Sequence, residues 1–351
     1  MNEPRLDIIK KHLSDPDKLL RPFFTSLNGD NSWLMSFPRP KSEQEATGKS
    51  YYHVAFEPWL KGAAHVLNKW FVHIAMVEDP EISTFEALED LVRDIEQAAA
   101  VHNPQICQQQ ADQQCSPSPV DAILLGFHFS DHLHPQTLHT FPLDIPVIAS
   151  PQAAALIKPW NHFKTIRTIH LLDPSETRWQ TPDNHPGEPL PTWLTPILLP
   201  GKGVLHFVHA IIWSHTLDNE EIHEVIFQSP HGIQPDAKPL NAFLDSEPKT
   251  QKLAMLHGLK ESFTAGVQTT YGAKGGLALH RKVGGVEHWL LSHNANMEYT
   301  GIFMRLSRTN DIQHTVEWTL EEGKKDGSSS EDYKEPNFAR VPNGGSMVLT
   351  C

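Results

Sequence analysis

The chain has 351 residues, 39% of them hydrophobic, which is long enough to bury a sizeable core as one large domain or two small ones. Its formal net charge of −13 argues against nucleic acid and against an anionic membrane surface as partners, because both attract basic patches. A neutral or weakly anionic small molecule suits this charge better as a substrate.

The N-terminal residues Met1–Asp7 are charged and form no apolar segment, and no later run is long enough to span a bilayer. We therefore expect a soluble, cytoplasmic protein. Its three cysteines, Cys107, Cys115 and Cys351, are an odd number without metal-type spacing, which favours reduced thiols over a disulfide framework.

The first third of the chain predicts two strands and then a long helix. Residues 32–37 and 52–56 are rich in aromatic and apolar side chains and have the pattern of strands. Ser83–Glu86 is a capping box ahead of an amphipathic helix. We expect one domain over residues 1–351, with a helical extension over 1–30 and loop insertions over 103–120, 173–202 and 321–340.

Chemistry is expected where a buried strand over Ala122–Leu125 ends. Directly after it come His128, Asp131, His132 and His134, which are three imidazoles and a carboxylate within seven residues. Loops at strand ends commonly present ligands, and neutral imidazole with carboxylate suits Zn, Fe or Mn. A tight turn can direct the first three to one point while His134 points elsewhere. The alternative is a polar loop, since the chain holds 22 histidines.

Strands and helices alternate after this cluster, which favours an α/β layered fold. We expect strands over 146–149, 165–171 and 203–213, helices over 151–160, 251–259 and 277–283, and a glycine-rich turn over 272–276. A histidine alone on an apolar strand face, such as His209, is more often a core residue than a ligand. However, the strand Val225–Phe227 is followed by His231, and another short strand leads into His293. Polar groups at four strand ends together favour a functional site.

The Asp131–His132 pair behind a hydrophobic strand, with further histidines downstream, resembles the metallo-β-lactamase superfamily, whose first motif is His-x-His-x-Asp-His. Two histidines of that motif are replaced by Phe127 and Phe129. The sequence is more similar to a divergent branch found in plants and fungi, with a His-x-Phe-[Ser/Thr]-Asp-His-x-His motif. Residues Glu57–Gly62 resemble the family's Asp-Pro-Trp-Leu-x-Gly segment, with Glu57 replacing Asp. There we expect a turn with a buried Trp59.

The resemblance implies an αββα sandwich, in which two mixed sheets pack face to face with helices outside. It also implies a metal site. His231 stands where the family has an Asp that bridges two metals, and because an imidazole cannot bridge in this way, one metal or none is expected. The candidate ligands are His128, Asp131, His132, His209, His231 and His293, and the candidate catalytic residues are Asp131 and His231.

We therefore predict a hydrolase of a small organic ester, lactone or thioester, of the kind used in secondary metabolism, with one zinc ion or, alternatively, iron or manganese. The metal would lower the pKa of water toward neutrality, and Asp131 would orient or deprotonate that water. Two alternatives stay open. One is a metal-free lyase or cyclase that uses His and Asp as acid and base. The other is a non-catalytic binding protein with a degenerate site.

Overall fold

The computed structural model describes residues 7, 9–11, 13, 19–102, 118–327 and 334–350. Contacts within the chain divide it into two compact units. The first unit comprises residues 1–62, 78–167 and 341–350, and the second comprises 63–77, 168–340 and 351. Residues 1–6, 8, 12 and 14–18 of the predicted 1–30 extension and residues 103–117 of the predicted insertion lie outside the described residues, as do the three cysteines. The described end of that extension contains a strand, Phe23–Ser26.

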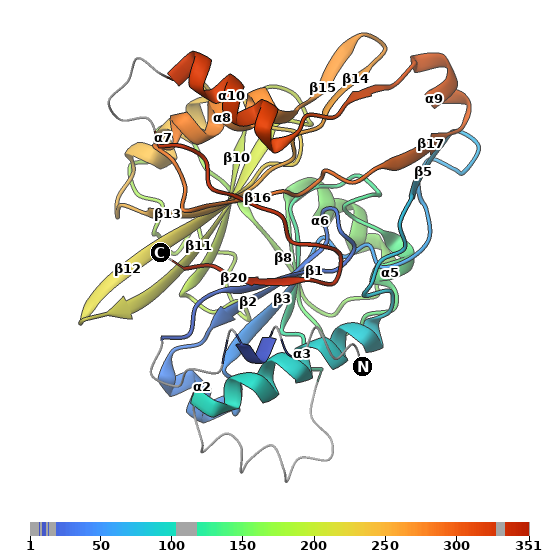
Figure 1. The fold of residues 1–351 in the computed structure, drawn as a ribbon. Coiled ribbons are helices and arrows are strands. Elements are labelled where there is room, and N and C mark those ends of the chain that lie inside the picture. Colours follow the sequence, from blue (N-terminus) through green and yellow to red (C-terminus); the bar gives the residue numbers. More distant parts are fainter. Residues whose placement is uncertain are drawn as a thin grey trace. The chain divides into compact units, whose positions relative to one another are not determined.

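A seven-stranded mixed sheet organises the first unit (Figure 1). Its neighbours β1, β2, β3 and β20 are antiparallel, whereas β3, β6 and β7 run parallel. The parallel strands therefore end at the same edge of the sheet. The order across the sheet is β20 (Ser346–Val348), β1 (Phe23–Ser26), β2 (Trp33–Pro38), β3 (Tyr51–Phe56), β6 (Ala122–Leu125), β7 (Val147–Ala149) and β8 (Ile166–Thr168).

Helix α3 (Phe85–Ala99) covers one face of this sheet (Figure 1). The capping prediction is off by one residue: the side chain of Thr84 accepts a hydrogen bond from the Ala87 amide. Leu88 and Ile95 on the buried face join a core with Ile123 of β6. The other helical segments of this unit are α2 (Lys41–Thr47), η1 (Ala100–His102), α5 (Pro135–Leu138), α6 (Pro151–Ile157) and η2 (Lys158–Trp160).

The second unit also contains a seven-stranded mixed sheet, with its own buried core. Strands β12, β13, β16 and β19 run parallel, and β10, β11 and β12 form an antiparallel meander. The order across the sheet is β19 (Phe338–Ala339), β16 (His288–Leu290), β13 (Gln251–Leu256), β12 (Glu220–Gln228), β11 (Phe207–Leu217), β10 (Leu194–Pro200) and β9 (His170–Leu171).

Two small three-stranded sheets complete the second unit. One consists of β15 (Val267–Tyr271), β14 (Glu261–Thr264) and β18 (Asn310–Ile312), and the other of β17 (Met297–Thr300), β5 (Val72–Met76) and β4 (Ala64–Val66). The helices of this unit are α7 (Lys238–Asp245), α8 (Gly272–Lys282), α9 (Ile302–Ser307) and α10 (Val316–Gly327).

These elements confirm the predicted α/β class with two large mixed sheets. The helix predicted over 251–259 is wrong, because Gln251–Leu256 is strand β13. Leu253, Ala254 and Met255 favour a helix by themselves. In the fold they are buried between β12 and β16, and ladder pairing on both sides overrides that weak preference.

Three further predictions need correction. The proposed 173–202 loop contains β10, whose two prolines weakened its strand pattern. The glycine-rich turn over 272–276 is the start of helix α8, where glycines allow close packing. The proposed 321–340 loop contains the end of α10 and strand β19, while residues 328–333 lie outside the described part. Within the described chain, no helix combines the length and apolar character needed to cross a bilayer.

Candidate functional site

In the first unit, a carboxylate and an imidazole meet at the carboxyl ends of two parallel strands. Phe56 at the end of β3 lies opposite Leu124 of β6, so the residues that follow each strand emerge side by side. Glu57 follows β3 directly and has a left-handed backbone, with φ of +44°. Its Oε2 accepts a hydrogen bond from Nδ1 of His132, with a distance of 2.7 Å between the two atoms. Both side chains are fully buried.

Glu57 is fixed by other hydrogen bonds as well. Its Oε1 accepts from the Gly126 amide at 3.1 Å, and its Oε2 also accepts from the Asn31 side-chain amide at 2.5 Å. Ser32 donates to the backbone carbonyl of Glu57 at 2.7 Å and accepts from the Trp59 amide at 2.8 Å. Trp59 is buried, as predicted. This network fixes the His132 ring so that Nε2 is the nitrogen that faces away from Glu57.

The charge around His132 favours its protonated form when no metal is present. Burial by itself would lower the pKa of His132, but the Glu57 and Asp131 carboxylates, together with the hydrogen bond to Glu57, raise the pKa to about 9. The Asp131 Oδ2 atom lies 3.7 Å from Nε2 of His132. Asp131 is partly exposed, so its carboxylate is accessible to solvent as well as to the imidazole.

The neighbouring histidines of the cluster differ in role. His128 is partly buried against the rings of Phe127 and Phe129, and its pKa is lowered by burial and then by the charge of His132. His134 points into the structure, where its Nδ1 lies 2.8 Å from Oγ1 of Thr137 and its side chain caps helix α5. The expectation that His134 points elsewhere is confirmed, and its role is to begin a helix.

In the second unit, histidines follow three adjacent parallel strands. Strands β12, β13 and β16 end at Gln228, Leu256 and Leu290, and His231, His257 and His293 come within three residues of those ends. Because parallel strands end at one edge of a sheet, the imidazoles that follow these strands lie at the same edge. In the first unit, Glu57 and His132 lie together at a sheet edge for the same reason.

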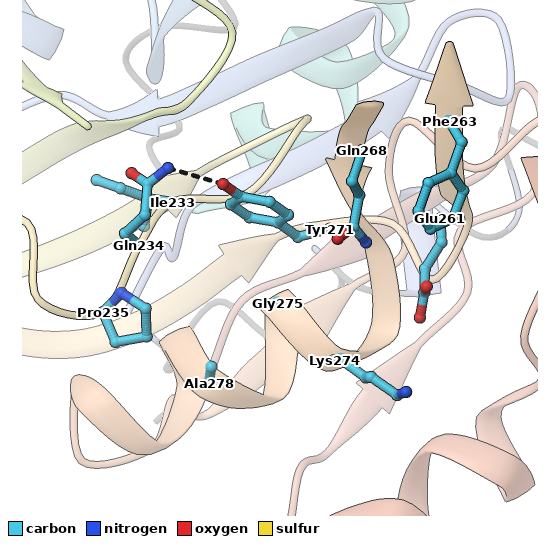
Figure 2. Close-up of a pocket in the computed structure, with 10 residues that line it drawn as sticks. All are labelled: Ile233, Gln234, Pro235, Glu261, Phe263, Gln268, Tyr271, Lys274, Gly275 and Ala278. Carbon is cyan, nitrogen blue, oxygen red and sulfur yellow. Dashed lines mark hydrogen bonds between the residues drawn. The ribbon is translucent and has the colours of Figure 1, made fainter. Parts of the chain in front are cut away.

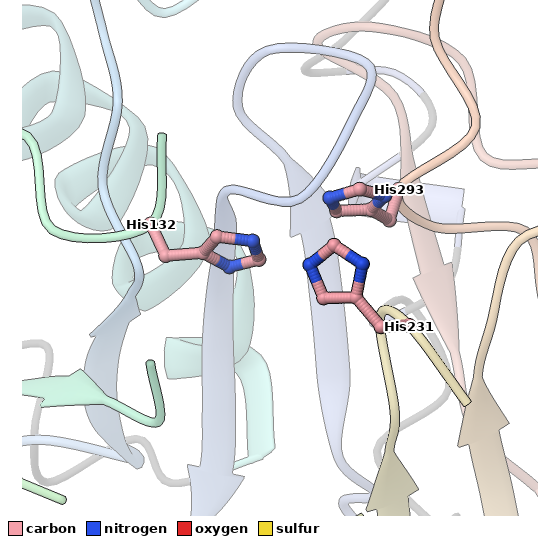
Figure 3. Close-up of side chains that lie close together, drawn as sticks. All are labelled: His132, His231 and His293. Carbon is pink, nitrogen blue, oxygen red and sulfur yellow. The ribbon is translucent and has the colours of Figure 1, made fainter. Parts of the chain in front are cut away.

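His231 and His293 form a close pair at this edge. Their ring centroids are 4.9 Å apart, and Figure 3 draws both rings. Nδ1 of His231 lies 2.9 Å from the hydroxyl of Thr270, and the carbonyl of His231 accepts from the Tyr271 amide at 3.0 Å. His293 has a left-handed backbone with φ of +55°. Both rings are partly buried, so two imidazoles are presented together from separate loops.

Two other histidines of this unit are completely buried and neutral. His209 lies on β11 opposite Gln228, at the end of β12, so it belongs to the same edge of the sheet as His231. Burial lowers the pKa of His209 to about 3. Burial also lowers the pKa of His257 to about 4, although a hydrogen bond from its Nδ1 to the Gly258 carbonyl offsets part of that effect.

Sequence reasoning missed Glu57 and Thr270. Glu57 follows a buried strand directly, which is the same signal that singled out His132, but it was interpreted as part of a turn. Thr270 gave no signal, because it contacts His231 from a strand 39 positions further along the chain.

Two solved structures resemble the chain over nearly its whole length. One is a possible metal-dependent hydrolase from Veillonella parvula DSM 2008, with a TM-score of 0.50, 11% identity, and coverage of 94% of this chain and 100% of that one. The other is an isothiocyanate hydrolase from Delia radicum gut bacteria, with a TM-score of 0.50, 12% identity, and coverage of 93% and 99%. No protein-family model matches the sequence, and no curated protein matches it significantly. At these identities the similarity shows a shared fold.

Proposed function

We propose that the chain is a metal-dependent hydrolase of a small organic ester, lactone or thioester. Of the two structures with a similar fold, one is described as a possible metal-dependent hydrolase and the other as an isothiocyanate hydrolase. Residues 128–134, His-Phe-Ser-Asp-His-Leu-His, resemble the motif of the divergent branch of the metallo-β-lactamase superfamily and support a place in it, with Phe127 where that motif has its first His.

The pairing of Glu57 with His132 is the observation that carries the proposal. A histidine that ligates a metal usually donates its other ring N–H to a carboxylate, which fixes the tautomer and makes the ligating nitrogen more basic. Glu57 has this relation to Nδ1 of His132, at 2.7 Å and out of contact with solvent. The Thr270 hydroxyl has a similar relation to Nδ1 of His231, at 2.9 Å. In each unit, the ring nitrogen that would ligate a metal is therefore Nε2.

We propose that His132, His231 and His293 hold one metal ion, with His128 or His209 as a further ligand. Burial lowers the pKa of His128 and His209, so both are neutral at pH 7, the form in which imidazole ligates. Imidazoles with a nearby carboxylate suit zinc, and also iron or manganese. Such an ion would act as a Lewis acid on a carbonyl oxygen and would make water more acidic.

Asp131 is proposed to accept the proton of the attacking water. Its partly exposed carboxylate lies 3.7 Å from Nε2 of His132, so it can reach solvent beside the proposed ligand. In hydrolysis the water oxygen bonds to the acyl carbon, the acyl C–O or C–S bond breaks, and the proton passes to the departing alcohol or thiol.

Elemental analysis of protein purified without chelator tests the proposal. We expect close to one equivalent of a transition metal in the parent, and a clear loss in each of the variants His132→Ala, His231→Ala and His293→Ala. The variant His139→Ala is the control, because His139 is exposed and its ring nitrogen Nδ1 bonds to the Pro135 carbonyl. A protein zinc site is tight enough to keep its metal through purification. A metal content below about a tenth of an equivalent in the parent would therefore contradict the proposal.

One observation favours a second candidate, a metal-free lyase or cyclase. With a pKa of about 9, His132 is protonated at neutral pH when no metal is bound, and Asp131 beside it is a carboxylate base. Such a pair could act as general acid and general base without a metal. Turnover that survives exhaustive chelation would select this function over the first.

A further inference from the structure

A pocket of about 470 Å³ lies within the second unit, next to the residues that hold His231 (Figure 2). Ile233 and Gln234 on its wall follow His231 almost directly. Tyr271, also on the wall, donates its backbone N–H to the His231 carbonyl at 3.0 Å. A molecule in this pocket would therefore lie beside the proposed ligand His231.

Tyr271 presents a hydroxyl proton to this pocket. Its oxygen accepts a hydrogen bond from the Gln234 side-chain amide at 2.7 Å, so the O–H can donate to a ligand. The ring is fixed by stacking on His206, with 4.2 Å between centroids and 4° between planes. Gly232 leaves room for the ring, because a Cβ there would lie 2.9 Å from Cδ2 of Tyr271.

A carboxylate and an ammonium group also line the pocket without pairing with each other. Glu261 is nearly buried, and its Oε1 accepts from Nε2 of His314 at 3.0 Å. Among the described residues its Oε2 has no hydrogen-bond partner, so this oxygen is available to a ligand. Lys274 forms no ion pair with a described carboxylate, and its Nζ lies 6.0 Å from the centre of the Trp318 ring.

The local fold places these two charged groups at the same end of the pocket (Figure 2). Glu261 of β14 pairs with Tyr271 of β15, and the chain then turns into α8, which carries Lys274. The turn requires glycine at position 272, where φ is +52° and a Cβ would lie 2.7 Å from Cγ of Glu261. His314, which bonds to Glu261, stacks on Trp318 with 3.8 Å between ring centroids. The Glu261 carboxylate therefore contacts one ring of this pair, and the Lys274 ammonium lies over the other.

We propose that this pocket binds the zwitterionic head group of an α-amino acid, so that the substrate is a side-chain ester or thioester of an amino acid. This inference rests on the proposed hydrolase function. The ligand ammonium would bind Glu261 Oε2 and its carboxylate would bind Lys274. The apolar walls at Phe263 and Ala278 take the methylene groups, and Tyr271 O–H donates to the ester oxygen. A zwitterion matches two opposite charges that do not neutralise each other.

A matched set of four methyl esters tests this class of substrate. The γ-methyl ester of L-glutamate carries both head-group charges, monomethyl glutarate lacks the ammonium, methyl γ-aminobutyrate lacks the carboxylate, and methyl butyrate lacks both. We expect kcat/KM to fall about tenfold when the ammonium is lost, because Glu261 is buried. The loss of the carboxylate should cost only about threefold, because Lys274 is exposed and solvent weakens its attraction.

Two variants assign these preferences to residues. Glu261→Gln keeps an acceptor for His314 and should make the glutamate and glutarate esters equivalent within about twofold. Lys274→Gln should remove the smaller preference over methyl γ-aminobutyrate. Lys282→Gln is the matched control, because Lys282 is exposed on the same helix and does not line the pocket. Variants that keep the parent's preferences would overturn the assignment.

Calorimetry with L-glutamate, glutarate and γ-aminobutyrate separates this inference from the proposed function. If no ester is hydrolysed but L-glutamate binds more tightly than the two single-charge analogues, the pocket assignment stands and the hydrolase proposal fails. If all four esters are hydrolysed at similar kcat/KM, or if the three ligands bind alike, the zwitterion pocket is wrong.

Discussion

Both units place histidines just beyond the ends of parallel strands, but they surround them with different chemistry. In the first unit, His132 is bound to the Glu57 carboxylate, and its pKa is raised to about 9. In the second, His231 bonds to a neutral hydroxyl and His209 is buried, with its pKa lowered to about 3. In the metal-free protein, His132 of the first unit is therefore charged, whereas the buried His209 of the second unit is neutral.

The comparison shows that strand topology decides where a histidine lies, whereas its partners decide which form it takes. A carboxylate neighbour stabilises imidazolium or strengthens a ligating nitrogen, and burial away from charges favours the neutral ring. Variants that change one partner at a time test this difference between the units.

The largest effect is expected from His231→Ala in the second unit. Loss of partners of metal ligands already costs about 10- to 100-fold, so loss of a ligand should lower kcat/KM by more than about a hundredfold. Because His231 is only partly buried, the free energy of unfolding should change little. The measurements are steady-state kinetics on a confirmed substrate and urea unfolding. A variant that is fully active, or one that is unfolded, would make His231 a structural residue.

Asp131→Asn should have the next largest effect. The change keeps the shape of the side chain but removes its charge, so we expect a rate about a hundredfold lower, the usual scale for loss of a general base. Stability should change little, because Asp131 is partly exposed and solvent weakens its attraction to His132. A rate within about threefold of the parent would remove Asp131 from the mechanism.

Glu57→Gln addresses the first unit's partner group directly. The amide can still accept from His132 but no longer carries a charge, so metal affinity should fall about 10- to 100-fold. Competition with a chromogenic chelator measures this affinity. Glu96→Gln is a matched control, because Glu96 is another buried carboxylate that bonds to a histidine, His53. If both changes have the same effect, Glu57 has no special relation to the metal.

The sequence predicted the places of these groups better than their partners. A short apolar run marked β6, and the polar residues behind it marked His132, because strand ends are readable from local pattern. Glu57 also follows an apolar strand directly, but the segment that it begins resembles a turn motif, which points to a structural role. Thr270 could not be found, since its contact with His231 depends on how β15 folds back. Strand β13 was missed because its residues favour a helix until neighbouring strands bury them.

The Glu57–His132 pair should also make the metal-free protein sensitive to alkali. The pKa of His132 is about 9 in the fold against 6.5 for an unperturbed histidine, so its stabilising effect is complete below pH 6.5 and is lost as pH rises through 9. The total is on the order of 3 kcal/mol, with a slope of about 1.4 kcal/mol per pH unit. Urea unfolding of chelated protein measures it. Glu57→Gln should flatten the profile, and an unchanged profile in that variant would contradict the prediction.

His209 should show the opposite sign, with a smaller effect over the accessible pH range. Its folded pKa of about 3 lies below the unperturbed 6.5, so the unfolded chain takes up a proton that the folded chain excludes. The stability associated with neutral His209 is therefore present above pH 6.5 and is lost as pH falls toward 3, by about 1.4 kcal/mol per unit. Between pH 6.5 and 5.5, where the unfolded histidine goes from half to almost fully protonated, the chelated parent should lose about 1 kcal/mol relative to His209→Leu, which cannot be protonated. Parallel unfolding profiles for parent and variant would mean that His209 is not desolvated as the fold implies. If the His132 and His209 profiles instead had the same sign, the distinction between a carboxylate-bound imidazole and one that is only buried would be lost.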